Sequence, residues 1–161
     1  LQEIASSVSI PCIRKDFTID EYMIYEARIL GASAVLLICA LLPEKTLRNY
    51  LAICDTLGLS ALVEAHTEEE VACALVCGAR IIGVNNRNLK NITVDIGNSE
   101  RLRRMIPSDI LFVAESGIKT RRDVEALEKM HVDAVLIGET LMRAPDKKHM
   151  LDELRGKESA K

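Results

Sequence analysis

A repeated alternation of short apolar runs with helical stretches constrains the fold of this chain most strongly. Apolar segments such as 34–38, 61–63 and 111–114 are typical of strands that are buried on both faces of a parallel sheet. Each is followed by a stretch in which apolar residues recur at helical spacing, and Gly31, Gly58 and Gly78 each precede a strand by one or two residues. The pattern predicts six strand–helix units of about two dozen residues each.

Polar residues mark where the helices begin. Three pairs have the spacing of a capping box, in which the first side chain accepts a hydrogen bond from the backbone three residues on: Thr18 with Glu21, Thr67 with Glu70 and Thr120 with Asp123. Pro43 suits the first position of a helix. We therefore expect helices to start at these four places.

Two parallel architectures compete. A doubly wound sheet would carry a glycine-rich phosphate turn after its first strand, whereas Lys15, Asp16 and Phe17 follow the strand at 10–15. A (β/α)8 TIM barrel fits better, although it needs eight units and about 250 residues. The 161 residues open on Leu1 without Met, in a stretch typical of the end of a helix. We expect residues 1–161 to form a single α/β domain, a partial TIM barrel that is truncated at the N-terminus and comprises units three to eight.

Composition narrows the classes of partner. A formal net charge of −3, 3% aromatic residues and no Trp argue against a nucleic-acid partner. The longest apolar run, 34–42, is too short to cross a bilayer. Cys73 and Cys77 lie one helical turn apart, but no His or further Cys joins them at ligand spacing, so buried free thiols are the better interpretation. We expect a cytoplasmic protein with a small-molecule ligand and with no metal, no cofactor, no nucleic acid and no membrane partner.

Polar side chains follow the strands, at the ends that meet on one face of a barrel. This ring comprises Lys15, Glu64, Asn85, Arg87, Glu115 and Ser116. A cation, two carboxylates and an amide around one cavity suit acid–base chemistry, and a structural cluster of ion pairs is the alternative. His66 could orient Glu64, although a supporting or solvent-facing place is the commoner one for such a histidine. Gly117 and Gly138 follow the last two strands, where barrels usually bind phosphate.

Five strand-end segments resemble successive motifs of the indole-3-glycerol phosphate synthase family. They are IRKDF at 13–17, LVEAH at 62–66, IGVNNRNL at 82–89, VAESGI at 113–118 and IGETLMR at 137–143. The resemblance covers essentially the whole chain, in order. It implies a carboxy-lyase of tryptophan biosynthesis, which closes the ring of 1-(2-carboxyphenylamino)-1-deoxyribulose 5-phosphate with loss of carbon dioxide and water.

The resemblance also implies a role for each matched residue. The catalytic set would be Lys15, Glu64, Asn85 and Glu115, the substrate-binding residues Arg87 and Ser116, and the phosphate site Gly117, Gly138 and Glu139. Lys15 would be the general acid that activates the ribulose carbonyl, and Glu64 a proton-transfer group. Glu139 stands where a small hydroxyl residue is frequent in the family, so its carboxylate must point away from a phosphate.

Other interpretations remain open. The family's Ser-Pro-Ser-Lys-Gly segment and its second catalytic lysine are absent from this sequence, which leaves a catalytically incompetent half-barrel that only binds phosphate as the alternative. A phosphoribosylanthranilate isomerase would not share Lys15, Glu64 and Asn85. The strands at 10–15 and 134–138 would each have an unpaired edge, which favours self-association.

Overall fold

The computed structural model describes residues 1–87, 95 and 97–157, and within these ranges the strands form one curled, parallel sheet. The strands are β1 (Ile13–Arg14), β2 (Ala34–Ile38), β3 (Ser60–Ala65), β4 (Ile81–Asn85), β5 (Leu111–Glu115) and β6 (Ala134–Leu136). Their order in the sheet is their order in the chain, so each strand pairs with the next one along. The arrangement is part of a TIM barrel, as the alternation predicts.

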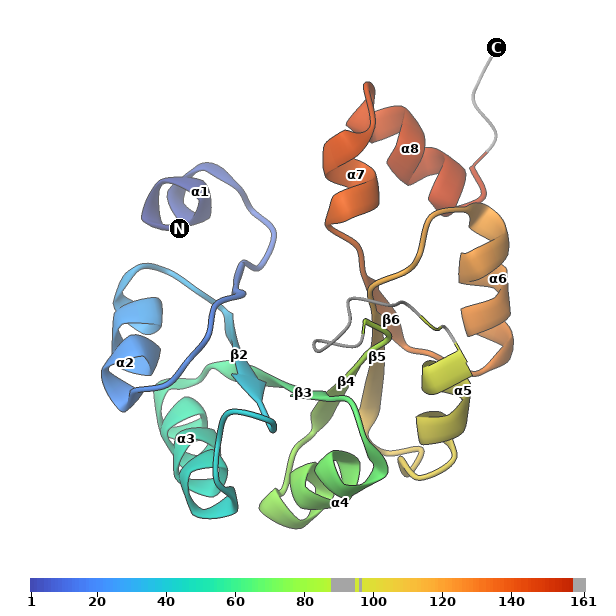
Figure 1. Ribbon diagram of the computed structural model, residues 1–161. Helices are drawn as coiled ribbons and strands as arrows, with labels where there is room; N and C mark the ends of the chain where they lie inside the picture. The colour runs from blue at the N-terminus through green and yellow to red at the C-terminus, as the bar shows by residue number, and fades with distance from the viewer. Residues whose placement is uncertain (88–94, 96, 158–161) are drawn as a thin grey trace.

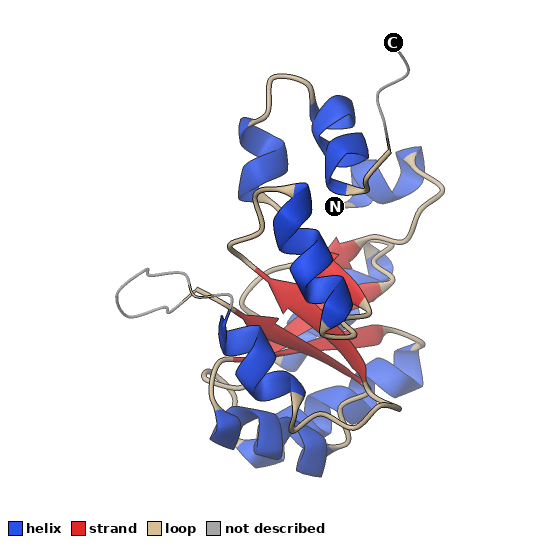
Figure 2. Ribbon diagram, turned by 90° about the vertical axis from the view of Figure 1, so that its right-hand side faces the viewer, coloured by secondary structure: helices blue, strands red, loops and turns tan. Residues whose placement is uncertain are grey.

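Helices follow the outside of the curled sheet (Figure 1), and Figure 2 shows the strands side by side within them. They are α1 (Gln2–Ser7), α2 (Glu21–Ile29), α3 (Glu44–Leu57), α4 (Glu68–Cys77), α5 (Gly97–Arg103), α6 (Arg121–Lys129), α7 (Glu139–Arg143) and α8 (Lys147–Leu154). In the described part of the chain, no helix has both the length and the apolar character that crossing a membrane requires.

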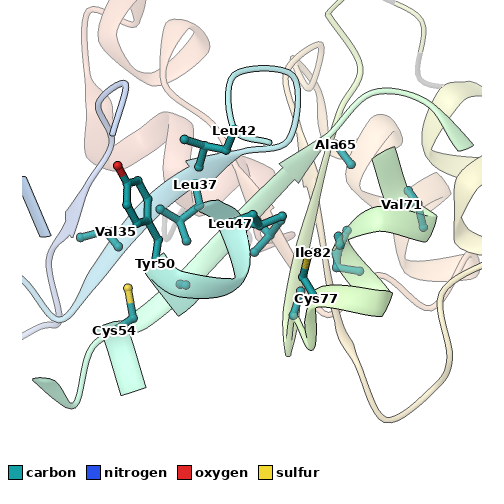
Figure 3. Packing of buried hydrophobic residues seen from close by; sticks show 14 of the residues in the cluster. Val35, Leu37, Leu42, Leu47, Tyr50, Cys54, Ala65, Val71, Cys77 and Ile82 are labelled. Carbon is teal, nitrogen blue, oxygen red and sulfur yellow. The ribbon is translucent and has the colours of Figure 1, made fainter. Parts of the chain in front are cut away.

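Side chains alternate between the two faces of each strand, and this alternation separates the core from the site. On β2, Val35 and Leu37 face outward and pack with helix residues such as Leu47 of α3 (Figure 3). Val63 of β3 belongs to the same cluster. The alternate residues Leu36, Ile38 and Leu62 of the same strands, together with Val113 of β5, form a smaller apolar cluster on the inner face. Glu64, Asn85 and Glu115 occupy inner-face positions as well, so the strand period fixes their direction.

The helix starts agree with the sequence at three places. Thr67 Oγ1 accepts a hydrogen bond from the Glu70 backbone, and Thr120 and Asp123 form a full capping box. Pro43 marks the start of α3 but is its N-cap, one residue before the predicted first position. The capping role predicted for Thr18 is wrong. Asp20 caps α2 instead, with its carboxylate accepting from the Tyr22 backbone, because a carboxylate also interacts favourably with the helix dipole.

The first strand is shorter than the predicted segment 10–15. It consists of Ile13 and Arg14 alone, since Pro11 has no N–H with which to extend the ladder. Within the described residues β1 pairs only with β2, and β6 pairs only with β5. Apolar side chains are exposed near both edges, among them Phe17 at 64% and Met142 at 72%.

We expect this chain to self-associate through these edges, because unpaired strand groups beside exposed apolar side chains favour pairing with another copy. Light scattering after size exclusion should show a mass that rises with protein concentration. Val135→Lys, which places a charge on β6, should reduce the association. Val76→Lys is the matched control, since Val76 is exposed on α4, away from both edges. A constant monomer mass for the unmodified chain would contradict the expectation.

Candidate functional site

One ammonium group lies between two buried carboxyl groups at the carboxyl end of the strands. Lys15 follows β1, and its Nζ lies 3.2 Å from Glu64 Oε2 and 3.2 Å from Glu115 Oε2. The glutamate side chains are only 3% and 1% exposed, whereas that of Lys15 is 34% exposed. The site therefore holds one ionisable group that is partly open to solvent and two that are nearly closed from it.

The register of the strands brings the other polar groups alongside. Asn85 and Glu115 are direct partners across β4 and β5. Asn85 Nδ2 donates a hydrogen bond to Glu64 Oε1 at 3.0 Å, while Lys15 donates to Glu64 Oε2. Both oxygens of Glu64 are thus satisfied. Those of Glu115 accept no hydrogen bond from the described residues, because the contact with Lys15 has ion-pair distance without hydrogen-bond geometry.

This arrangement shifts the pKa values of Glu115 and Lys15. Burial raises the pKa of Glu115 to about 7, the charge of Glu64 adds to the rise, and Lys15 opposes it. Burial alone would lower the pKa of Lys15, but the charges of Glu115 and Glu64 outweigh it and the pKa is raised. Lys15 therefore stays protonated near neutral pH, where Glu115 exchanges its proton. Such a pair suits general acid–base chemistry.

Gly83 on β4 is a functional position that sequence reasoning missed. A Cβ built at this glycine would overlap Glu115 Oε1 and would lie 3.1 Å from Leu62 Cδ1. Gly83 pairs with Glu64 on one side and Val113 on the other, so the Glu115 carboxyl reaches over the space that a side chain would fill. A glycine inside an apolar strand was the signal, because it often marks a close approach.

Asn86 is a second position that sequence reasoning missed. It is buried, and its Nδ2 donates to the Ser116 carbonyl at 3.2 Å while its Oδ1 accepts from the backbone N and the Oγ of Ser99. Ser116 adopts a left-handed conformation with φ of 66°, unusual for a residue with a side chain. Asn86 therefore ties the turn after β5 to α5. The signal in the sequence was an amide directly after a strand, beside Asn85.

A cavity of about 900 Å³ opens beside the ion pair. Six of the nine residues expected in the site line it: Lys15, Arg87, Ser116, Gly117, Gly138 and Glu139. The other three are buried: Glu64 and Glu115 contact Lys15, and Asn85 contacts Glu64. This volume is in the range of pockets that bind small molecules. Asn88 and Leu89, which end one of the five motifs, lie outside the described residues.

Glu139 binds two arginines at the rim of this cavity. Its carboxylate oxygens lie 2.7 Å from Arg87 Nη2 and 3.1 Å from Arg143 Nε. The hydrogen bond from Arg87 and the charge of Arg143 lower the pKa of Glu139. Gly138 precedes it with open space around the position of a Cβ, so no described protein atom requires a glycine there.

Within the described ranges, no group of three His, Cys, Asp or Glu side chains is placed to hold a metal ion. The five cysteines are all free. Burial raises the pKa of Cys39 and Cys54 to about 12 and that of Cys77 to about 11, so these three are neutral thiols near pH 7.

We expect Gly83→Ala to destabilise the fold by about 1–3 kcal/mol, because its methyl group displaces the buried Glu115 carboxyl. Denaturant unfolding measures this loss. Gly138→Ala is the matched control and should cost less, since its Cβ meets no atom within 4 Å. The loss should shrink in the background of Glu115→Ala, which removes the overlapping group. An equal loss in both backgrounds would contradict the clash with Glu115.

The Glu115 carboxyl should also make stability depend on pH. Its contribution as a neutral group is complete below the pKa of an unfolded carboxyl, about 4.3, and is lost as the pH rises through about 7. The melting temperature should therefore fall between about pH 5 and pH 8. Glu115→Gln should flatten this fall, whereas Glu153→Gln, at an exposed position of α8, should leave it unchanged. An identical slope in all three proteins would count against a neutral Glu115.

Solved structures of low sequence identity share this architecture. A mandelate oxidase variant superposes with a TM-score of 0.77 at 18% identity, covering 98% of this chain and 59% of its own. A structure described as native KDPGal superposes with a TM-score of 0.67 at 14% identity, covering 97% of this chain and 71% of its own. At such identities the likeness shows the fold alone, a TIM barrel of which this chain forms a part.

Sequence comparisons are more specific. The family model described as indole-3-glycerol phosphate synthase matches residues 1–154. Relatives with that name from Ruminiclostridium cellulolyticum and Leuconostoc mesenteroides are 60% and 53% identical over 156 residues. Each match covers 97% of this chain and 60% of the relative, so the chain spans about three fifths of the length of these curated relatives. The chain belongs to the indole-3-glycerol phosphate synthase family.

Proposed function

We propose that this chain supplies a large part of an indole-3-glycerol phosphate synthase active site. The observation that carries the proposal is the position of Lys15, which lies between Glu64 and Glu115 and lines a cavity of suitable size. The substrate would be 1-(2-carboxyphenylamino)-1-deoxyribulose 5-phosphate, the one implied by the family.

Lys15 would act first, as the general acid. Its charged Nζ donates a proton to the ribulose carbonyl oxygen while the aromatic ring carbon attacks the carbonyl carbon. The bond from that ring carbon to the carboxylate then breaks, carbon dioxide leaves, and its electron pair restores the aromatic ring. A raised pKa keeps Lys15 protonated until the carbonyl is in place.

The carboxyl groups would complete the reaction. Loss of water requires that a proton leave the carbon next to the new bond and that the hydroxyl leave as water. Glu64 is the proton-transfer group for this step, held by Lys15 and Asn85, and Glu115 lies on the other side of Lys15 with a pKa of about 7. One group that takes a proton and one that can return it suit such an elimination.

The rest of the cavity would bind the substrate. Backbone N–H groups at Ser116, Gly117, Gly138 and Glu139 would bind the phosphate, because a dianion needs several convergent donors. Arg87 would position the substrate from the rim of the cavity, where its guanidinium group binds Glu139. We also place the protein in the cytoplasm, since its cysteines are free thiols, the state usual in a reducing compartment.

The test is formation of indole-3-glycerol phosphate, followed by fluorescence. The chain is assayed alone and together with the part of the Ruminiclostridium cellulolyticum relative that it does not match. Product should form in the mixture, and Lys15→Ala or Glu64→Gln should lower the rate by about 100-fold or more. Lys45→Ala is the control, because Lys45 is exposed on α3, away from the site.

The alternative outcome is also informative. If no product forms in the mixture while inorganic phosphate still binds, and if Lys15→Ala leaves that binding unchanged, the chain is a binding module and the proposed activity is wrong.

A further inference from the structure

A row of three ionisable groups connects the surface with the buried carboxyl pair. His66 lies between the end of β3 and the start of α4. Its Nδ1 is 3.3 Å from Glu70 Oε2, and its Nε2 is 3.4 Å from Glu64 Oε1. The side chains are 22%, 13% and 3% exposed in the order Glu70, His66 and Glu64. Among the described residues, the imidazole of His66 is therefore the group that contacts the carboxylates of both Glu70 and Glu64.

Backbone hydrogen bonds hold His66 in this place. Its N–H donates to Glu70 Oε2 at 2.7 Å, and its carbonyl accepts from Asn98 Nδ2 at 3.3 Å. The same amide of Asn98 also donates to the carbonyl of Asn85, so the ends of β3 and β4 are tied together. Nε2 makes no hydrogen bond with the described residues, and it lies 3.4 Å from Glu64 Oε1 without hydrogen-bond geometry.

The two carboxyl groups of the site have unequal surroundings as a result. Glu64 accepts hydrogen bonds from Lys15 and Asn85 and has the His66 ring beside it. Glu115 shares only the ion pair with Lys15. When two neighbouring carboxyl groups hold one proton, the proton favours the group whose charge is less well stabilised.

We propose that His66, oriented by Glu70 and charged, is a positioning residue that keeps Glu64 ionised and thereby places the proton of the carboxyl pair on Glu115. The proposal rests on the proposed function and deepens it, because it says which carboxyl group is ionised and can accept the proton in the elimination step. It makes no use of turnover, so it can be tested in the chain without substrate.

The charges around the ring agree with this geometry. The hydrogen bond with Glu70 raises the pKa of His66 above its ordinary value, burial opposes the rise, and the charges of Glu64, Glu70 and Glu115 add to it. The pKa of Glu70 is lowered by the same hydrogen bond. Lys15 contacts the other oxygen of Glu64, at 3.2 Å. Since the pKa of His66 is raised, its charge acts below that pKa and is lost as the pH rises through it.

Carbon-13 NMR of labelled glutamate and histidine side chains tests the proposal. In the unmodified chain, the titration near pH 7 should appear mainly at the carboxyl carbon of Glu115. In His66→Gln, Glu64 and Glu115 should share that titration. In Glu70→Gln, the titration of His66 should move to lower pH. His149→Gln is the control, because His149 is exposed on α8, and it should leave the carboxyl titrations unchanged.

A purely structural role for His66 would lower the melting temperature without changing which carboxyl group titrates. The proposal is overturned if Glu64 and Glu115 titrate in His66→Gln as they do in the unmodified chain. Should His66→Gln fail to fold, Glu70→Gln decides, and an unchanged His66 titration there would overturn the proposal. Absence of product in the enzymatic assay would not alter these titrations, so the two proposals fail separately.

Discussion

The contact of Lys15 with two buried carboxyl groups is the interaction on which the site depends. Glu64 and Glu115 are almost closed from solvent, and two uncompensated carboxylates would be costly there. One ammonium cannot neutralise both, so the site favours a single shared proton. Lys15 reaches this position from the turn after a strand of only two residues, which pairs with β2 alone among the described strands. The charge balance of the centre therefore depends on the edge of the sheet.

The other polar groups adjust this balance in different ways. Asn85 and His66 stabilise the charge of Glu64, whereas Gly83 leaves space for the Glu115 carboxyl without offering it a hydrogen bond. Asn86 and Asn98 contact neither carboxyl group in the described structure, but their amides connect the ends of β3, β4 and β5 with α5. The positions of the ionisable side chains thus rest on a second layer of uncharged amides, whose hydrogen bonds are directional and independent of pH.

Much of this could be predicted from the sequence. The apolar runs and helix starts predict parallel strand–helix units, and the strand ends predict which polar residues meet, because both follow from local periodicity. Asp20 was missed as a cap since Thr18 has the capping-box spacing with Glu21 and Asp20, with Met23 three residues on, does not, and only the path of the chain shows which of the two caps the helix. His66 follows Glu64 by two residues, so the sequence already suggests that it could orient Glu64, whereas the need for Gly83 depends on the side chain of Glu115, about thirty residues further along. Such contacts arise from tertiary packing and have no period.

The alternation of the strands has a further consequence. Outward residues such as Val35, Val63, Val84 and Phe112 belong to the larger core with the helices, while the inner positions hold a smaller apolar cluster and the carboxyl groups of the site. Residues that pack against the helices thus alternate along each strand with residues that face the inside of the curled sheet. Substitutions at the inward-facing positions can therefore change the site while the outward residues keep their packing against the helices. Gly83 is the exception to this independence, because its backbone pairs with the neighbouring strands while the Glu115 carboxyl occupies the space that a side chain would fill.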